Sequence, residues 1–368
     1  MATANEPTTV LATPNIALVK YWGRRDNRLN LPTNSSISVT LDESLSTRTS
    51  VLFTNRIRND TLYLNGERHR LGTMKDEKFL YMGRVVEELR KIDGSKRKVL
   101  IITENGYPTG AGLASSAAGA SALVYAVSGA LDLDLDASEL SRISRLISGS
   151  GCRSLFGGFV VWHMGKETDG NDSYAERLYA PEHWPEVIDL IAIVDRGRKM
   201  VPTSEGHMRT VASSHLYKYR PDHAQERVMR LMDALKHKDF ESLAHITMRD
   251  SNNMHAVCLD SYPPISYLND DSKRIMNAVH TLNESVGEVV AAYTFDAGPN
   301  AHIMTRKKDV ERVKKAVADA TGKRAEFIVA GQGSGPRILS AEESLIDMEK
   351  LRPKTETLAA GQGRAEMS

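Results

Sequence analysis

Hydrophobic and polar positions follow two different periods along this chain, and the period changes from one segment to the next. Apolar residues recur at helical spacing over 77–92, which predicts a helix. Short apolar runs predict strands at 49–54, 61–64 and 99–102, and the first two are expected to pair with each other. After the third strand, a stretch of small residues leads into a second helix that runs through 121–127.

The same hydrophobic patterns predict further elements as far as residue 330. A strand within 155–162 is entered through a tight turn, and the pattern restarts near residue 188. The later segments are strands expected at 188–194, 288–295, 301–305 and 326–330, with helices at 224–236, 272–283 and 308–321. Strand–helix units with antiparallel returns predict an α+β sandwich. The pattern places a boundary between two halves near residues 185–190.

Composition narrows the class of protein. The 368 residues are 41% hydrophobic and 26% charged, as in a soluble globular protein, and suffice for one large or two ordinary domains. A net charge of +1 favours neither nucleic acid nor an anionic membrane as a partner. No apolar run approaches the roughly 18 residues of a membrane span. Two cysteines, Cys152 and Cys258, provide no disulfide framework, and without a secretory pattern at the N-terminus the cytoplasm is the expected location.

The small-residue stretch at 106–119 carries the strongest functional signal. Gly110 and Gly112 permit backbone angles closed to other residues and let a ligand approach the main chain. Free N–H groups at the start of the following helix favour an anion, and Ser115 and Ser116 add hydroxyl groups there. The stretch has neither the Walker ending nor a dinucleotide fingerprint. It predicts a phosphate-binding loop; the alternative is a helix that packs closely on a sheet.

Three charged residues are candidates for chemistry. Lys20 follows an apolar run and could neutralise a phosphate or carboxylate. Arg153 lies in a second small-residue loop between Ser148 and Ser154, where its planar fork suits two anionic oxygens. Asp296 follows an apolar strand and could act as a base or position a hydroxyl group. Taken singly, these residues have structural alternatives: a surface lysine, a plain turn, and a turn-forming aspartate.

Two further clusters are less specific. Residues 248–255 and 260–267 are rich in His, Asp, Asn and Ser, but their spacing matches no standard metal motif. We expect structural packing, or packing beside the substrate, there in preference to a metal site. Arg24 and Arg25 form a basic pair that is either an anion contact or a solvated face, and Arg24 is favoured as the contact because it is close to Lys20.

Taken together, these segments resemble the mevalonate diphosphate decarboxylases, a branch of the GHMP kinase superfamily. Several motifs in one order, spread over most of the chain, carry the resemblance. They are NIALVKYWG at 15–23, LPTNSSISVTL at 31–41, PTGAGLASSAAG at 108–119, SGSGCRSLFGG at 148–158, DSNNMH at 250–255, PPISYLN at 263–269 and YTFDAGPNA at 293–301.

The resemblance implies a two-domain GHMP kinase fold, with an N-terminal part like ribosomal protein S5 domain 2 and a ferredoxin-like C-terminal part. The domains would span 1–187 and 188–345, followed by a polar tail at 346–368. It also implies a homodimer, ATP with Mg²⁺, and a 5-phosphorylated mevalonate as the substrate. The expected reaction is ATP-dependent decarboxylation of 5-diphosphomevalonate to isopentenyl diphosphate.

Site residues follow from the matching motifs. The resemblance implies that Asp296, Arg153 and Lys20 form the catalytic set. The residues implied for the phosphorylated end of the substrate are Tyr21, Arg24, Ser148, Ser150, Arg153 and Ser204. Those implied for the ATP phosphates are Pro108, Gly110, Gly112, Leu113, Ala114, Ser115 and Ser116. The resemblance assigns no metal ligand to this chain.

The chain departs from the family pattern at a few positions. Arg24 stands where the family has Lys, Ile147 stands where it has Gly, and Glu205 and His207 do not fit the usual segment around Ser204. A carboxylate beside a diphosphate is unfavourable unless it points away. The alternatives are therefore decarboxylation of 5-phosphomevalonate with ATP, or of mevalonate 3,5-bisphosphate without it. A small-molecule kinase and a non-catalytic ligand sensor are the other possibilities.

Overall fold

The computed structural model describes residues 6–72, 77–106, 115–197 and 200–354. The N-terminal half is built on two large sheets. The first has six strands in the order β16 (Arg337–Ile338), β1 (Thr8–Ala12), β6 (Thr47–Thr54), β9 (Lys98–Asn105), β7 (Thr61–Leu64) and β8 (Glu67–Arg70). The second has four strands in the order β11 (Ala175–Tyr179), β10 (Phe159–Trp162), β5 (Ser36–Thr40) and β2 (Asn15–Val19).

Helices cover these sheets. Helices α1 (Glu77–Asp93), α2 (Ser115–Ala130) and α3 (Ala137–Ile147) share a core with the six-stranded sheet. A short 3₁₀ segment, η1 (Gly149–Leu155), follows α3, and a small hairpin joins β3 (Arg24–Asp26) to β4 (Leu31–Pro32). The body of α2 is rich in buried alanine, and a Cβ atom on Gly129 would lie 3.0 Å from the Thr8 side chain. Close packing therefore accounts for the small residues of the helix body.

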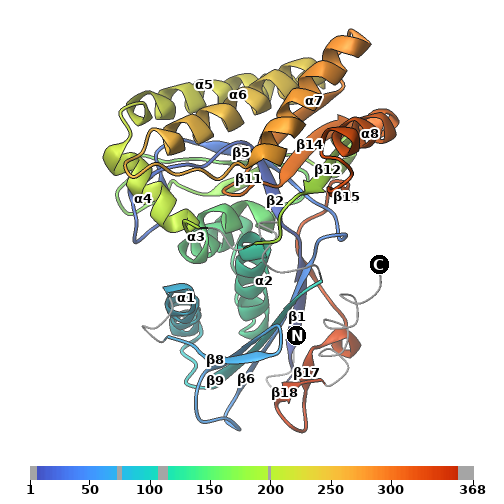
Figure 1. Cartoon of the computed structure of the whole chain (residues 1–368). Helices are drawn as coiled ribbons and strands as arrows, with labels where there is room; N and C mark the ends of the chain where they lie inside the picture. Colours follow the sequence, from blue (N-terminus) through green and yellow to red (C-terminus); the bar gives the residue numbers. More distant parts are fainter. Residues whose placement is uncertain (1–5, 73–76, 107–114, 198–199, 355–368) are drawn as a thin grey trace.

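The C-terminal half is one antiparallel sheet with helices on it (Figure 1). Its strands run in the order β13 (Ala291–Phe295), β14 (Ala301–Arg306), β12 (Val187–Ile193) and β15 (Glu326–Ala330). Its helices are α4 (Thr203–Ser213), α5 (Arg220–His237), α6 (Phe240–Leu259), α7 (Asp270–Val286) and α8 (Val310–Ala320). The remaining 3₁₀ turns are η2 (Pro181–His183), η3 (Tyr217–Tyr219), η4 (Lys307–Asp309) and η5 (Ala341–Glu343).

One hydrophobic core joins the halves. It combines apolar residues of β2, β5 and β10 with those of the C-terminal sheet, α5 and α6. The ends of β2 and β13 are therefore held together by the largest buried cluster of the described chain. In the parts of the chain that the structure describes, no helix is long and apolar enough to cross a membrane.

The structure corrects one predicted pairing. Strands β6 and β7 do not pair with each other, because β9 lies between them, antiparallel to β6 and parallel to β7. The partner of β7 on its other side is β8, through a two-residue turn at Asn65 and Gly66, which have φ of 49° and 84°. The Asn-Gly pair in the sequence indicates this turn, because such a pair readily adopts positive φ. No local pattern in the sequence indicates the order of the strands.

The C-terminal segment returns to the N-terminal half. Strand β16 adds to the edge of the six-stranded sheet beside β1, and a hairpin joins β17 (Ile346–Asp347) to β18 (Arg352–Pro353). The sequence predicts a polar tail from residue 346, but Ile346 is buried with Leu345, Leu52 and Leu100. The adjacent apolar side chains of Leu345 and Ile346 pack into the core, so residues 346–354 are part of the fold.

Candidate active site

Lys20 and Asp296, 276 residues apart, form an ion pair. Lys20 follows β2 and Asp296 follows β13, and the Lys20 Nζ atom lies 2.6 Å from Asp296 Oδ1. The Lys20 side chain is 3% exposed and that of Asp296 is 33% exposed. The pair therefore has a buried cation beneath a carboxylate that a ligand can reach. This excludes a surface lysine at position 20.

Helix α6 holds the backbone of Lys20 and that of Phe295, the residue before Asp296. The Asp250 carboxylate accepts a hydrogen bond from the Lys20 backbone N–H at 2.7 Å. The Ser251 hydroxyl accepts one from the Phe295 N–H at 3.0 Å, and His255 Nε2 lies 3.3 Å from the Phe295 carbonyl oxygen. The polar cluster at 248–255 is thus a buried helix face that positions two strand ends. Among the described residues, no group of three or more His, Cys, Asp or Glu side chains could hold a metal ion.

Asp250 is also the centre of a buried charge cluster. Its carboxylate lies 3.2 Å from the guanidinium groups of Arg220 and Arg227, and Arg220 also donates to the Lys20 carbonyl oxygen at 3.1 Å. Neither Asp250 nor Arg220 has any exposed side-chain surface. The two ion pairs therefore hold the end of β2 against α5 and α6, with no water to replace a lost partner.

We expect Asp250→Ala to lower the free energy of unfolding by about 3–5 kcal/mol, because it leaves the buried Arg220 charge without a negatively charged partner. Urea denaturation followed by circular dichroism measures this. Asp233→Ala is the matched control: its exposed pair with His237 is expected to contribute no more than about 1 kcal/mol. Equal effects of the two substitutions would contradict the importance of the buried cluster.

Arg153 lies on η1 and is 2% exposed. Its Nε donates to Asn15 Oδ1 at 3.1 Å and to Ser38 Oγ at 2.9 Å, and its Nη1 donates to Ser36 Oγ at 2.7 Å. Burial lowers the pKa of Arg153, while the charges of Cys152 and Asp296 oppose that shift. The guanidinium group is therefore fixed by neutral side chains and acts electrostatically on the same carboxylate as Lys20.

Tyr21 and Arg24 lie beside this group. Arg24 Nε donates to the Tyr21 hydroxyl at 2.7 Å, and burial raises the pKa of Tyr21 although Arg24 opposes the rise. Gly149 packs directly against the Tyr21 ring, and a Cβ atom at position 149 would lie only 2.6 Å from it. The hydroxyl groups of Ser148 and Ser150 are 3.4 Å apart on this same loop. The structure thus brings together the tyrosine and both serines that the sequence motifs indicate.

Helix α4 approaches the same place through His207. The His207 ring accepts a hydrogen bond from the Gly23 N–H at 2.8 Å and lies 4.5 Å from the Tyr21 ring, between ring centres. Ser204 is half-buried in the first turn of α4. Glu205, in the same turn, forms an ion pair with Arg209 one turn further on. The departures from the family pattern at 205 and 207 therefore have local partners.

The predicted ATP loop lies largely outside the described residues. Pro108, Gly110, Gly112, Leu113 and Ala114 are among those not described, whereas Ser115 begins α2 and Ser116 is exposed in its first turn. The first turn contains no acidic residue. The Ser121 hydroxyl donates to the Ser154 carbonyl oxygen at 2.9 Å, so the start of α2 lies beside η1. An anion at this helix end would meet free N–H groups and no carboxylate of the helix.

Two buried histidines make stability depend on pH. Burial, with Lys20, lowers the pKa of His255 to about 4, and burial with Arg24 and Arg220 holds the pKa of His207 well below its usual value. Below pH 6.5 the unfolded chain takes up protons that the folded chain does not, until pH reaches about 4 for His255. Stability is therefore lost as pH falls through this window.

We expect the free energy of unfolding to decrease from pH 6.5 to 4 by up to roughly 3 kcal/mol from His255 alone. Urea denaturation at several pH values measures the slope. His255→Asn should reduce the dependence of the free energy of unfolding on pH by the contribution of His255, because asparagine takes up no proton in this range. An unchanged slope in that variant would contradict the assignment.

Comparison with known proteins decides the family. Residues 12–175 match the model described as diphosphomevalonate decarboxylase-like N-terminal domain. Residues 189–358 match the mevalonate 5-diphosphate decarboxylase C-terminal domain. The chain belongs to the diphosphomevalonate decarboxylase family. The family and the α+β, two-domain GHMP kinase fold that the motifs predict are thereby confirmed.

Relatives of this family cover almost the whole chain. The diphosphomevalonate decarboxylase of Saccharomyces cerevisiae is 48% identical over 304 residues, which is 80% of this chain and 76% of the relative. The solved mevalonate diphosphate decarboxylase from Trypanosoma brucei is 32% identical, with a TM-score of 0.84 over 93% of this chain and 100% of the other. MDDEF in complex with MVAPP, AMPPCP and magnesium is 33% identical, with a TM-score of 0.81 over 91% and 99%.

Several residues that shape the site were not singled out from the sequence. Asn15, Ser36 and Ser38 hold Arg153, and Asp250 holds Lys20. A signal was present for the first three, because Asn15 begins the apolar strand β2, and Ser36 and Ser38 alternate with apolar residues in β5. The structure shows that all three are buried. A buried polar side chain needs a hydrogen-bond partner, so such positions indicate an internal polar group nearby.

Proposed function

We propose that this member of the diphosphomevalonate decarboxylase family converts 5-diphosphomevalonate and ATP to isopentenyl diphosphate, carbon dioxide, ADP and phosphate. The observation that carries the proposal is the contact of Lys20 Nζ with Asp296 Oδ1 at 2.6 Å. A reaction that moves one phosphoryl group and then expels it needs a base beside fixed positive charge. The ion pair supplies both at one point.

The chemistry follows from these groups. Asp296 accepts the proton of the C3 hydroxyl, and the C3 oxygen bonds to the γ-phosphorus of ATP as the bond from that phosphorus to ADP breaks. The C3–O bond then breaks with its electron pair on the departing phosphate. The electrons of the C1–C2 bond form the C2–C3 double bond, and C1 leaves as carbon dioxide. Lys20 and Arg153 stabilise the negative charge of the carboxylate and the departing phosphate.

The phosphorylated end of the substrate is assigned to the surface between η1 and α4. The proposed contacts are Tyr21, Arg24, Ser148, Ser150, Arg153 and Ser204. A planar guanidinium offers two parallel hydrogen bonds to phosphate oxygens, so Arg24 in place of a lysine keeps the charge and adds a donor. Glu205 does not oppose a diphosphate with a free charge, because its carboxylate is paired with Arg209.

ATP is assigned to the loop before α2. Pro108, Gly110, Gly112, Leu113, Ala114, Ser115 and Ser116 are the proposed contacts, of which only the last two lie in the described helix. The absence of acidic residues from the first turn of α2 fits an anionic ligand. Mg²⁺ would be held mainly by the phosphate oxygens of ATP, where it neutralises charge and orients the γ-phosphoryl group. MDDEF, a relative, has been solved with MVAPP, AMPPCP and magnesium together.

Release of carbon dioxide from three substrates, with and without ATP, tests this function. We expect turnover with 5-diphosphomevalonate and ATP, and none with mevalonate 3,5-bisphosphate alone. Preference for 5-phosphomevalonate would overturn the assignment of the diphosphate contacts. Activity on the bisphosphate without ATP would remove the phosphoryl-transfer step. A stable phosphorylated product without carbon dioxide would make the chain a kinase, and nucleotide binding without any turnover would make it a sensor.

We further propose a homodimer in the cytoplasm. The homodimer rests on the family resemblance alone, and sedimentation equilibrium of the full chain measures the mass directly. The location is supported by the state of the cysteines, because Cys152 and Cys258 are both buried and unpaired. Free thiols of this kind are usual in a reducing compartment.

A further inference from the structure

A cavity of about 610 Å³ is lined mainly by helices α5 and α6, with one residue each from α7 and β13, and none of its lining residues belongs to the candidate active site. Its size is within the range of small-molecule sites. Its walls are unusually basic for a chain with a net charge of +1. The lining residues are His223, Glu226, Arg227, Arg230, His245, Ile246, Met248, Arg249, Asn252, His280 and Tyr293.

Three arginines face one carboxylate in this cavity. Glu226 is 3.7 Å from Arg230, and both side chains of that pair are 65% exposed, so the pair is weak. The side chain of Arg249 makes no hydrogen bond or ion pair with any other residue in the described ranges. Since Arg227 is paired with Asp250 beneath the cavity, the unbalanced positive charge comes from Arg249 and from the weakly paired Arg230.

Arg227 is a pre-organised donor at the base of the cavity. Its side chain is only 17% exposed, and its Nη1 atom lies 3.2 Å from Asp250 and 3.3 Å from Asn253 Oδ1. These two contacts fix the orientation of the Arg227 guanidinium group. A planar guanidinium has five N–H donors, so nitrogens remain for a ligand once one is anchored.

The floor of the cavity adds a neutral polar group. The Tyr293 hydroxyl accepts a hydrogen bond from Asn252 Nδ2 at 3.0 Å and lies 3.3 Å from His280 Nε2. Tyr293 is buried in β13, three residues before Asp296. Imidazole, amide and hydroxyl groups around a fixed arginine are the usual donors to phosphate oxygens.

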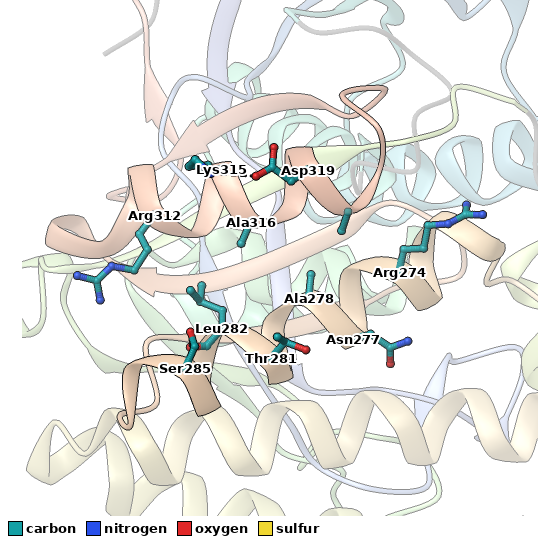
Figure 2. A pocket seen from close by; sticks show the side chains of 11 residues that line it. Arg274, Asn277, Ala278, Thr281, Leu282, Ser285, Arg312, Lys315, Ala316 and Asp319 are labelled. Carbon is teal, nitrogen blue, oxygen red and sulfur yellow. Dashed lines mark hydrogen bonds and ion pairs between the residues drawn. The ribbon is translucent and has the colours of Figure 1, made fainter.

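A second groove of similar size provides a contrast. Helices α7 and α8 enclose about 570 Å³, with Arg274 and Arg312 at opposite ends (Figure 2). Here each cation has a carboxylate on its own or the adjoining turn. The pairs are Arg274 with Asp271 at 2.8 Å, Lys315 with Asp319 at 3.0 Å, and Arg312 with Asp309 at 3.8 Å. Volume alone therefore does not distinguish the two cavities. The pairing of the cations does, because Arg230 has only an exposed contact with Glu226 and the Arg249 side chain has no carboxylate partner among the described residues.

We propose that the cavity between α5 and α6 is a second anion-binding site, separate from the active site, that takes a small phosphorylated molecule carrying two or more negative charges. The anion would bind Arg227 at the base and Arg230 and Arg249 at the rim. Since Arg227 and the Lys20 backbone N–H share the Asp250 carboxylate, this site is connected to the catalytic lysine by two contacts. The binding itself does not depend on the reaction proposed above.

Protection of arginines from phenylglyoxal in the full chain tests the site, with inorganic diphosphate as the probe. Peptide mass spectrometry follows each arginine separately. At a diphosphate concentration about ten times its Kd, the modification rate of Arg230 and Arg249 should fall about tenfold. Arg274 and Arg312, which are exposed on the other groove, should react at an unchanged rate. Equal rates at Arg230 and Arg249 with and without diphosphate would overturn the proposal.

Calorimetric titration separates this site from the active site, which also binds phosphates in our proposal. The wild-type chain should bind one more diphosphate than the double variant Arg230→Ser, Arg249→Ser. The matched control, Arg274→Ser with Arg312→Ser, should keep the wild-type stoichiometry. Both pairs are exposed arginines on helices, so neither double variant should unfold the chain. The same stoichiometry in all three proteins would assign the protection to the active site and reject the second site.

Discussion

Replacing Asp296 with asparagine is expected to lower the rate of carbon dioxide release by a factor of about 10²–10⁴. Asparagine has nearly the same shape but cannot accept the C3 hydroxyl proton. It also removes the negative charge 2.6 Å from Lys20 Nζ, so the ammonium group loses the partner that orients it. ATP affinity should remain nearly unchanged, because the proposed phosphate contacts lie on another loop.

Steady-state release of carbon dioxide and calorimetric ATP binding measure the two effects separately. Asp195→Asn is a suitable control, because Asp195 follows strand β12 much as Asp296 follows β13. The Asp195 carboxylate accepts a hydrogen bond from the Gly197 N–H at 2.6 Å, which is the role of a turn-forming aspartate. If Asp296→Asn kept the turnover of the wild type, Asp296 would have only that turn-forming role.

Arg153→Ala is expected to lower kcat/KM by a factor of about 10²–10³, the usual effect of removing one fixed donor from developing negative charge. The Arg153 guanidinium is held by Asn15, Ser36 and Ser38, so it needs no reorganisation when substrate binds. Arg153→Lys should recover only part of the loss. A lysine keeps the charge but cannot reproduce the planar fork.

Arg145 provides the matched control for a buried arginine. Arg145 is 3% exposed and donates to the carbonyl oxygens of Leu29, Gly170 and Ser173, which is a purely structural set of contacts. Arg145→Lys should lower thermal stability while the turnover of the folded fraction stays near that of the wild type. If Arg153→Ala instead lost only stability, Arg153 would have no part in catalysis.

Local patterns in the sequence were sufficient for most elements. The periodicity at 77–92 corresponds to α1, the apolar run at 188–194 to β12, and the Asn65-Gly66 pair to the tight turn between β7 and β8. Helices α3, α4 and α6 were not predicted. In α6 the apolar pattern of the buried face is interrupted by Asp250 and Ser251, which hold the ends of β2 and β13. A periodicity argument depends on apolar side chains facing the core, so it fails where a helix buries polar groups that hold other strands.

The roles of Lys20, Arg153 and Asp296 follow from the family motifs, and measurement of the variants is needed to establish them. What the structure adds is their arrangement: it joins Lys20 to Asp296 directly, gives Arg153 a neutral polar support, and pairs Glu205 with Arg209. The pairing of Glu205 matters for the substrate, because it removes the objection to a diphosphate near Ser204. That pairing could not be assumed from the sequence, since the Glu205 side chain could have pointed either way.

The sequence by itself determined the kinds of chemistry available: a loop suited to phosphates, two candidate cations, a carboxylate after a predicted strand, and an order of motifs particular to one family. Only the tertiary structure decided which of these groups meet. Lys20 and Asp296 are brought together because β2 and β13, from different halves of the chain, share one hydrophobic core and are both bonded to α6. Contacts between distant segments depend on how whole sheets and helices pack, and no local pattern contains that information.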